Sequence, residues 1–302
     1  MWYMCVENTK MKSILTDPEY YTKMFQAYAK KSNKFSHLLK WAEEVFPKMV
    51  LEKLRESFSA ETQINMLGIG TGSGEMDRKL AASINTHFKS VRNVVVEPAK
   101  RQLEIYRSAL EETKSEFSGI DFDMRQMVFG KYREQEGDRP PKYHFISAIQ
   151  SIYYIDDIND TLRYLYDCLE DGGVMLITTL SDMGGFRQVW SSFPQIQDVV
   201  GPYPGTNDIR KHLSDLNIPF EENLQKSQAD ITSCFQEGSK EGQLIIDFLS
   251  RLIDLRGTAS AALYREVVEK LGSDQCSERK DDGTVLLNND WDAFVVYKQA
   301  HI

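Results

Sequence analysis

A glycine-rich loop that follows a short apolar run is the feature that most constrains the fold of this chain. Residues 64–69 form a mostly apolar run, which leads into the glycines of GIGTGSGE (68–75), and a helical pattern runs over residues 75–87. Glycine lets a backbone approach a ligand closely and adopt positive φ, and the start of a helix presents free N–H groups. The sequence therefore predicts a strand, a tight ligand-binding loop and a helix in that order.

The same alternation of strand and helix continues along the chain. Further strands are expected at residues 93–97, 121–126, 144–150 and 173–180, and further helices at 101–114 and 157–169. Runs such as VVV and VMLITT do not alternate with polar residues, which is typical of strands buried on both faces. The pattern predicts an α/β fold of the doubly wound, Rossmann-like class, in which helices cover both faces of a parallel sheet.

The flanking segments suggest a core with an insert. Residues 17–58 have apolar positions at helical spacing, which predicts two or three helices before the sheet. After residue 181 the sequence becomes rich in turns, with helices expected at 208–216 and 244–255 and a last strand at 284–297. We expect a core of residues 11–181 and 283–299 and a substrate-binding insert of residues 182–282, because inserts at strand ends commonly build the ligand site.

The spacing of the glycines distinguishes between cofactors. Gly70, Gly72 and Gly74 are two residues apart, whereas a dinucleotide fingerprint that starts at Gly70 would need a glycine where Glu75 stands. Glu97 ends the next strand, and its carboxylate offers acceptors for both hydroxyls of a ribose. The pattern favours S-adenosylmethionine over NAD; the alternative is a structural turn beside a solvated acid.

Composition excludes several partners. The chain has 45 acidic and 36 basic residues and a net charge of −9, which disfavours nucleic acid and anionic membrane surfaces. No run approaches the ~18 apolar residues of a membrane span, and the opening MWYMCVENTK lacks the basic leader and apolar stretch of a signal peptide, so we expect a cytosolic protein. The four cysteines and five histidines show no ligand spacing, which predicts no disulfide and no metal site.

Four segments together resemble the histamine N-methyltransferase family. They are VVVEPAKRQ (94–102), FISAIQSIYYIDDI (145–158), DITSCFQEGSKEGQLIIDFL (230–249) and GTVLLNN (283–289). The resemblance extends in the same order from about residue 11 to the end, and its late segments lie outside the common methyltransferase core. It implies a class I methyltransferase sheet with a smaller substrate-binding region in a monomer that transfers a methyl group from S-adenosylmethionine to a ring nitrogen of a small imidazole.

The resemblance also implies roles for individual residues. Cofactor-binding positions are Gly70, Gly72, Glu97, Gln102 and Ile149, with Glu97 on the ribose and Gln102 on the adenosine side. Gln150 and Asn289 are implied to orient the substrate. The implied aromatic walls of the substrate pocket are Tyr21, Phe25, Tyr153, Tyr154, Trp190, Phe193 and Phe248.

Lys34 departs from the family pattern. The family's acidic residue, which faces the amine of the substrate, aligns with Lys34, while Leu15, Phe186 and Phe129 replace a phenylalanine, a tryptophan and a serine. Two unit charges about 4 Å apart interact by roughly 4 kcal/mol at an effective dielectric near 20, so a lysine in the pocket would disfavour a protonated amine. Either Lys34 binds a substrate carboxylate, as in histidine or carnosine, or it points to solvent from a helix face.

The chemistry expected of this class does not require an acid–base pair. A neutral imidazole nitrogen can attack without a general base because its reference pKa is about 6.5. The protein then has to align donor and acceptor and exclude water, so we predict no catalytic residue. Three hypotheses stand: N-methylation of a small imidazole or amine, N-methylation of a carboxylate-bearing imidazole, and a binding protein that holds S-adenosylmethionine without turnover.

Overall fold

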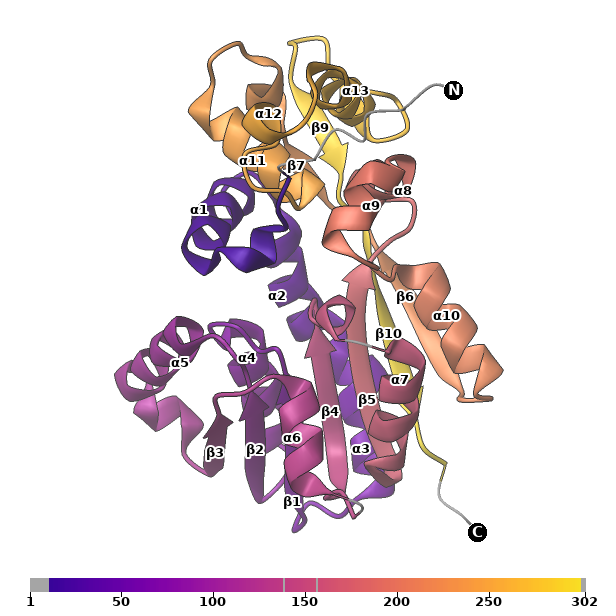
Figure 1. The fold of residues 1–302 in the computed structure, drawn as a ribbon. Helices are drawn as coiled ribbons and strands as arrows, with labels where there is room; N and C mark the ends of the chain where they lie inside the picture. The colour runs from indigo at the N-terminus through magenta and orange to yellow at the C-terminus, as the bar shows by residue number, and fades with distance from the viewer. Residues whose placement is uncertain (1–10, 138, 156, 300–302) are drawn as a thin grey trace. The chain divides into compact units, whose positions relative to one another are not determined.

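The computed structural model describes residues 11–299 except 138 and 156 (Figure 1). The predicted lack of a leader in residues 1–10 lies outside the described residues, as do Cys5 and His301. The chain forms two compact units. The helical unit comprises residues 11–35, Leu180–Tyr203 and Lys226–Trp291, and the sheet unit comprises Ser36–Thr179, Pro204–Gln225 and residues 292–299.

The sheet unit is built on a seven-stranded sheet. Its strand order is β3 (Ile120–Arg125), β2 (Ser90–Val96), β1 (Gln63–Ile69), β4 (Tyr143–Ile149), β5 (Leu169–Leu180), β10 (Trp291–Tyr297) and β6 (Phe220–Gln225). The pairs from β3 through β5 are parallel. This topology confirms the predicted doubly wound α/β fold. The strand order reverses between β1 and β4, and ligands of such sheets bind outside the carboxyl ends of strands at that point.

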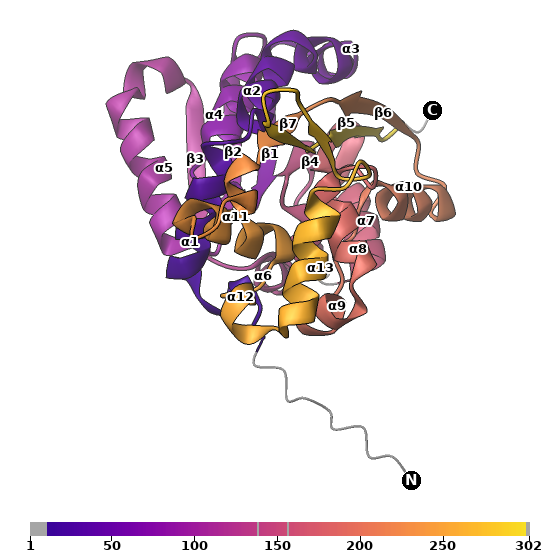
Figure 2. The same ribbon diagram turned by 90° about the horizontal axis from the view of Figure 1, so that it is seen from above.

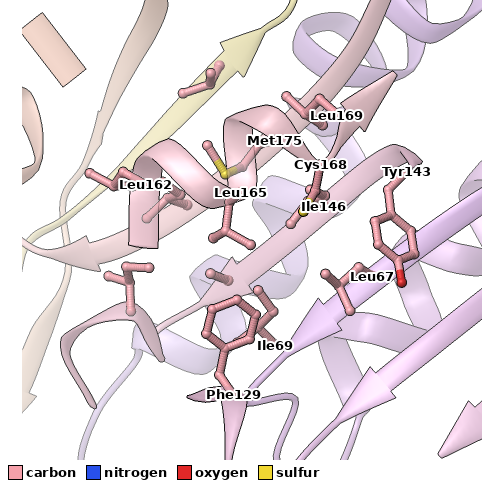
Figure 3. Packing of buried hydrophobic residues seen from close by; sticks show 14 of the residues in the cluster. Leu67, Ile69, Phe129, Tyr143, Ile146, Leu162, Leu165, Cys168, Leu169 and Met175 are labelled. Atoms are coloured by element: carbon pink, nitrogen blue, oxygen red, sulfur yellow. The ribbon is translucent and has the colours of Figure 1, made fainter. Parts of the chain in front are cut away.

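Helices cover both faces of this sheet (Figure 2). Val94 and Val96 of β2 belong to a buried cluster with residues of α6, α7 and α10, whereas Val95 packs with Leu103 and Tyr106 of α5. Figure 3 shows the first cluster, where side chains of α6 and α7 meet those of β1, β4 and β5. Successive strand residues face opposite sides, which explains why VVV does not alternate. The helices are α2 (Lys34–Glu44), which continues from the helical unit, η2 (Pro47–Leu51), α3 (Glu52–Ser57), α4 (Glu75–Asn85), α5 (Lys100–Glu112), α6 (Phe129–Glu136), α7 (Ile158–Asp167) and α10 (Thr206–Asp215).

The helical unit combines helices with a small sheet. Its helices are α1 (Pro18–Ala29), α8 (Gly185–Ser192), α9 (Pro194–Val200), α11 (Lys240–Ser250), α12 (Leu255–Thr258) and α13 (Ala261–Leu271). The sheet has the antiparallel order β7 (Gln228–Asp230), β9 (Val285–Asn288) and β8 (Ser277–Arg279). Helix α1 begins where the Asp17 side chain accepts the Tyr20 N–H, with Pro18 at its first position, an arrangement that favours helix initiation.

The structure corrects the predicted last strand. Residues 284–297 form two strands, β9 and β10, which lie in different sheets. The extended strand is interrupted at Asn289 and Asp290. The Asn289 N–H donates to the Ser227 carbonyl, and the Asp290 N–H donates to the Asn288 side chain. The break therefore places Asn289 and Asp290 between the two sheets along the chain.

Two further differences concern the region after residue 181. The predicted helix 244–255 is α11, which starts at Lys240 because Ser239 caps it and ends at Ser250 because Arg251 adopts a φ of 61°. Helix α10 and strand β6 belong to the sheet unit, although their residues fall within the predicted insert 182–282. The functional division into core and insert stays a prediction.

Within residues 11–299 as described, no helix is long and apolar enough to cross a membrane. In the same part of the chain, no three His, Cys, Asp or Glu side chains are grouped so that they could hold a metal ion. The cysteines Cys168, Cys234 and Cys276 are free and buried. Burial raises the pKa of the Cys168 thiol to about 11, so this thiol remains protonated near neutral pH.

Candidate active site

The glycine loop after β1 leaves space at one position only among its three positive-φ glycines. Gly70, Gly72 and Gly74 have φ values of 61°, 56° and 75°. A Cβ atom added at Gly70 would lie 2.5 Å from Cβ of Ser151, and one at Gly74 would lie 2.3 Å from the Tyr106 ring. A Cβ at Gly72 would meet nothing within 4 Å. Gly70 and Gly74 are thus required by packing, whereas the backbone at Gly72 is open to a ligand.

Glu97 joins this loop to the end of β2. Its Oε2 accepts the Gly72 N–H at 2.9 Å, and its Oε1 accepts the Ala99 N–H at 2.8 Å. Burial raises the pKa of the carboxyl, and these two hydrogen bonds oppose part of the rise. A carboxylate has about four lone-pair sites, so each oxygen keeps capacity for one hydroxyl donor. The geometry fits a diol such as a ribose beside Gly72.

A buried acid on α4, which the sequence analysis missed, supports the loop. Oδ2 of Asp77 accepts the Tyr106 hydroxyl at 2.5 Å and Asn93 Nδ2 at 2.6 Å. Burial raises the pKa of Asp77 to about 6, and these hydrogen bonds oppose the rise. A Cβ at Gly68 would lie 2.3 Å from Asp77 Oδ1. Acids are common in the first turn of a helix, so no sequence signal marks this one.

The exit of β4 reaches the same loop. Ser151 Oγ donates to the Ile69 carbonyl at 2.6 Å, which brings Ile149 and Gln150 to the end of β1. Gln150 has a φ of 51°, and its N–H donates to the Thr178 carbonyl at 3.0 Å. A non-glycine residue in this region costs about 1–2 kcal/mol, and such strain is concentrated at functional sites. The structure therefore places Gly70, Gly72, Glu97, Ile149 and Gln150 at or just after the carboxyl ends of β1, β2 and β4, and their binding roles stay a prediction.

Other predicted residues of the sheet unit lie nearby along the chain. Gln102 is half-buried in the first turn of α5, five residues after Glu97. Tyr153 and Tyr154 follow Gln150 in η4 (Ile152–Tyr154), with ring centroids 4.7 Å apart, and Tyr154 is 43% exposed. Phe129, which replaces the family's serine, is buried in the cluster of Figure 3.

In the helical unit, Phe248 is the centre of an aromatic cluster. Its ring centroid lies 4.6 Å from that of Tyr28, 5.9 Å from Phe25, 6.3 Å from Tyr21 and 5.8 Å from Phe186. The structure therefore brings together the predicted walls Tyr21, Phe25 and Phe248. Tyr28 is an additional member that the sequence analysis did not single out.

The cluster extends to α8. Phe186 stacks on Tyr203 at 5.6 Å, and Trp190 lies 6.4 Å from the same ring. The Arg251 guanidinium lies 4.1 Å from the Tyr203 ring centroid. Phe193 is buried at the end of α8. All five predicted aromatic residues of this unit thus lie on α1, α11 or α8, or at the end of α8.

A second group of this unit, the Ser32 cluster, consists of Tyr28, Ser32, Lys34, Asn289 and Asp290. Ser32 Oγ accepts Asn289 Nδ2 at 2.8 Å and the Lys34 backbone N–H at 3.1 Å. Ser32 also forms an antiparallel bridge with Ala229 of β7, which fixes the turn between α1 and α2. Asn289 is 1% exposed and Lys34 is 4% exposed. The alternative in which Lys34 points to solvent is therefore wrong.

Among the residues that the structure describes, the Lys34 ammonium has no direct partner. Burial lowers the pKa of Lys34 to about 7, and the negative charge of Asp290 opposes this fall. The Asp290 carboxylate already accepts Lys226 Nζ at 2.7 Å and the Ser227 N–H at 3.0 Å. In the described ranges, Lys34 Nζ forms no hydrogen bond and no ion pair. In the same ranges, Asn289 Oδ1 is buried without a hydrogen-bond partner. The Tyr28 hydroxyl is buried beside the side chains of Ser32 and Asn289 but makes no well-aligned hydrogen bond with either.

The chain is similar in sequence to known methyltransferases. The family model described as a methyltransferase domain matches residues 41–215. Histamine N-methyltransferase B of Xenopus laevis is 30% identical over 95% of this chain and 98% of its own length. Carnosine N-methyltransferase 2 of Gallus gallus is 29% identical over 90% of this chain and 84% of its own length.

Solved structures show the same fold at low sequence identity. The YcgJ protein of Bacillus subtilis aligns with a TM-score of 0.51 and 12% identity, covering 83% of this chain and all (100%) of its own. The plantazolicin methyltransferase BpumL, solved in complex with SAH, aligns with a TM-score of 0.50 and 13% identity over 95% of this chain and 93% of its own. With the sheet topology and the extent of the sequence matches, these findings show that the chain belongs to the histamine N-methyltransferase family of class I S-adenosylmethionine-dependent methyltransferases.

Proposed function

We propose that this protein N-methylates a small nitrogen-containing molecule. The observation that carries the cofactor half of the proposal is the Glu97 carboxylate bonded to the Gly72 N–H, beside a backbone position with open space. When bound, S-adenosylmethionine supplies a methyl group on a positively charged sulfonium. Glu97 would accept the ribose hydroxyls, Gly72 would let the backbone approach the cofactor, and Gln102 would contact the adenosine side. Gly70, which keeps the loop packed against Ser151, and Ile149 are the other proposed cofactor positions.

The proposed acceptor is an imidazole nitrogen. Two relatives are named for histamine and carnosine, and both of these molecules contain an imidazole ring. A planar ring packs favourably against aromatic side chains, which supports a substrate role for Tyr21, Phe25, Trp190, Phe193 and Phe248 in the helical unit and for Tyr153 and Tyr154 in the sheet unit. Gln150 in the sheet unit and Asn289 in the helical unit are each proposed, from the family resemblance, as amide side chains that bind the substrate.

The residues of the chain need to align and shield the acceptor rather than move a proton. An imidazole with a pKa near 6.5 is largely neutral at pH 7 and has a free lone pair. Gln150, held in its strained conformation by Thr178, can hold one ring nitrogen so that the other is free. Alignment of this kind and exclusion of water account for much of the lowering of the activation barrier in such transfers.

A methyl-transfer screen tests the proposal. Labelled S-adenosylmethionine is incubated with wild-type protein and histamine, histidine, carnosine or simple alkyl amines, and the label in each acceptor is counted. We expect label in the imidazoles, much less with Glu97→Ala at limiting cofactor, and wild-type levels with Glu104→Ala, an exposed glutamate seven residues further on. No label in any acceptor, despite saturable cofactor binding, would contradict an enzymatic role and favour a binding protein.

A further inference from the structure

We propose that the acceptor carries a carboxylate and that Lys34, the first residue of α2, binds it. The inference rests on the proposed function, because it names the class of molecule that the same substrate-binding residues accept. It is carried by Lys34, a residue that is 4% exposed and whose ammonium forms no hydrogen bond or ion pair with the described residues, and by the unused hydrogen-bonding capacity of the buried Asn289 Oδ1.

The first argument is the cost of Lys34 to the fold. A buried charge without a partner is strongly unfavourable, and a cation at the first position of a helix also opposes the helix dipole. The nearest acid that acts on Lys34, Asp290, is already paired with Lys226. In the described chain, no contact of the Lys34 ammonium offsets the free-energy cost of its burial, whereas an anionic ligand would offset it.

The second argument is the chemistry of the neighbours. Asn289 Oδ1 is a buried acceptor that receives no hydrogen bond from the described part of the chain, and the Tyr28 hydroxyl is a buried group that can donate or accept. A ligand that satisfies this set needs an acidic group for Lys34 and an N–H donor for Asn289. An imidazole bearing a carboxylate has both, while the ammonium of histamine would face a like charge at Lys34.

The third argument places this polar group beside the aromatic cluster. Tyr28 belongs to both: it lies in the Ser32 cluster, and its ring stacks on Phe248 at 4.6 Å with an interplanar angle of 29°. Phe25, in turn, contacts both Phe248 and Phe35, the residue after Lys34. A ligand whose ring packs on this cluster can therefore extend an acidic tail toward Lys34.

Two matched ligands test the inference. Histamine and 3-(imidazol-4-yl)propanoate have the same ring and a similar chain but opposite charge. Both are titrated into wild-type protein, Lys34→Met, Lys34→Arg and Lys34→Glu in the presence of S-adenosylhomocysteine at pH 6.5, and kcat/KM is measured with S-adenosylmethionine. Lys31→Met is the matched control, since Lys31 is partly exposed and pairs with Glu241 at 3.3 Å.

We expect wild-type protein and Lys31→Met to prefer the propanoate. Lys34→Met should weaken propanoate binding by roughly ten- to a hundredfold, the loss typical of one hydrogen bond to a charged group. Lys34→Arg should restore part of the preference, and Lys34→Glu should invert it toward histamine. A propanoate-to-histamine ratio that does not change with residue 34 would overturn the inference.

The outcomes separate this inference from the proposed function. If both ligands are methylated with a ratio that is independent of Lys34, the N-methyltransferase assignment stands and the carboxylate assignment is wrong. If neither these ligands nor any acceptor of the methyl-transfer screen is methylated, the proposed function fails, but the calorimetric comparison of wild type with Lys34→Met still decides whether Lys34 binds the acid.

Discussion

The Glu97 carboxylate accepts the Gly72 N–H at 2.9 Å, so one side chain joins the loop after β1 to the end of β2. The other oxygen of Glu97 accepts the Ala99 N–H, which fixes the carboxylate in place. A ligand that bonds to Glu97 therefore meets an acceptor that is already oriented and loses little side-chain entropy on binding.

Replacing Glu97 tests this arrangement. Glu97→Ala removes both acceptors, and one hydrogen bond to a charged group contributes about 1.5–3 kcal/mol, so affinity for S-adenosylhomocysteine should fall by roughly ten- to a hundredfold. The affinity of Glu97→Gln for S-adenosylhomocysteine should fall less, because an amide keeps one acceptor oxygen. Calorimetry measures both, and equal affinity in Glu97→Ala and wild type would exclude Glu97 from the cofactor site.

The glycine loop makes a second prediction through the contrast between Gly72 and Gly74. Alanine at either position has positive φ, at a cost of about 1–2 kcal/mol, but only at Gly74 does the new Cβ collide with the Tyr106 ring. Gly74→Ala should therefore lower the free energy of unfolding clearly more than Gly72→Ala. Gly72→Ala should instead lose more free energy of cofactor binding than free energy of unfolding. Calorimetry and denaturant titration on the same samples measure the two losses.

Equal losses of stability in the two alanine variants would mean that the space beside Gly72 is not what distinguishes it. Retained affinity in folded Gly72→Ala would mean that no ligand approaches this position.

Much of the fold and of the loop was predictable because the signals are local. The glycines, the apolar runs and the position of Glu97 at a strand end lie within about 30 consecutive residues, and each is tied to backbone geometry. The sequence analysis missed α6, because FGKYREQE is mostly polar and buries only Phe129 and Tyr132. It also read residues 284–297 as one strand, because apolar residues flank the polar triplet at 288–290 on both sides.

The Ser32 cluster could not be predicted in the same way. Ser32 and Asn289 are 257 positions apart, and their hydrogen bond depends on the pairing of β7 with β9. The sequence shows that Lys34 differs from its family, but burial and the lack of a partner are properties of the tertiary structure. Asp77 likewise acts through Tyr106 and Asn93, which no spacing rule connects.

Gln150 provides a third prediction, through its strained backbone. Gln150→Gly removes the side chain and relieves the positive φ, whereas Gln150→Ala removes the side chain and keeps the strain. Both variants should lose kcat/KM for the methyl acceptor to a similar extent. The free energy of unfolding of Gln150→Gly should stay within about 1 kcal/mol of that of wild type. The free energy of unfolding of Gln150→Ala should be lower than that of Gln150→Gly. Full activity per folded molecule in both variants would assign Gln150 a purely structural role.

The burial of Lys34 predicts a stability change that depends on pH. Its folded-state pKa is about 7 against an ordinary 10.5. Between these values the unfolded chain holds the proton and the folded chain does not, so the Lys34 contribution to the free energy of unfolding rises with pH from 7 to 10.5. Below pH 7 the folded protein bears the full penalty, on the order of several kcal/mol at most.

Lys34→Met removes this dependence. The variant should be more stable than wild type by the largest margin below pH 7, and the margin should shrink as pH rises toward 10. Denaturant titrations of both proteins at several pH values give the difference, in which other titrating groups cancel. Lower stability of Lys34→Met at pH 6 would show that the ammonium is well solvated or paired and would contradict its unpartnered burial.

The most direct test of the account is to find the atom that receives the methyl group. S-adenosylmethionine labelled with carbon-13 in its methyl group is incubated with the protein and each matched imidazole ligand, and heteronuclear NMR assigns the labelled methyl in the product. We predict a methyl signal that correlates with imidazole ring protons, with the propanoate labelled faster than histamine, and strong loss of the signal in Glu97→Ala at limiting cofactor. Cofactor binding without any labelled product, or a label on the side-chain amine alone, would contradict the account.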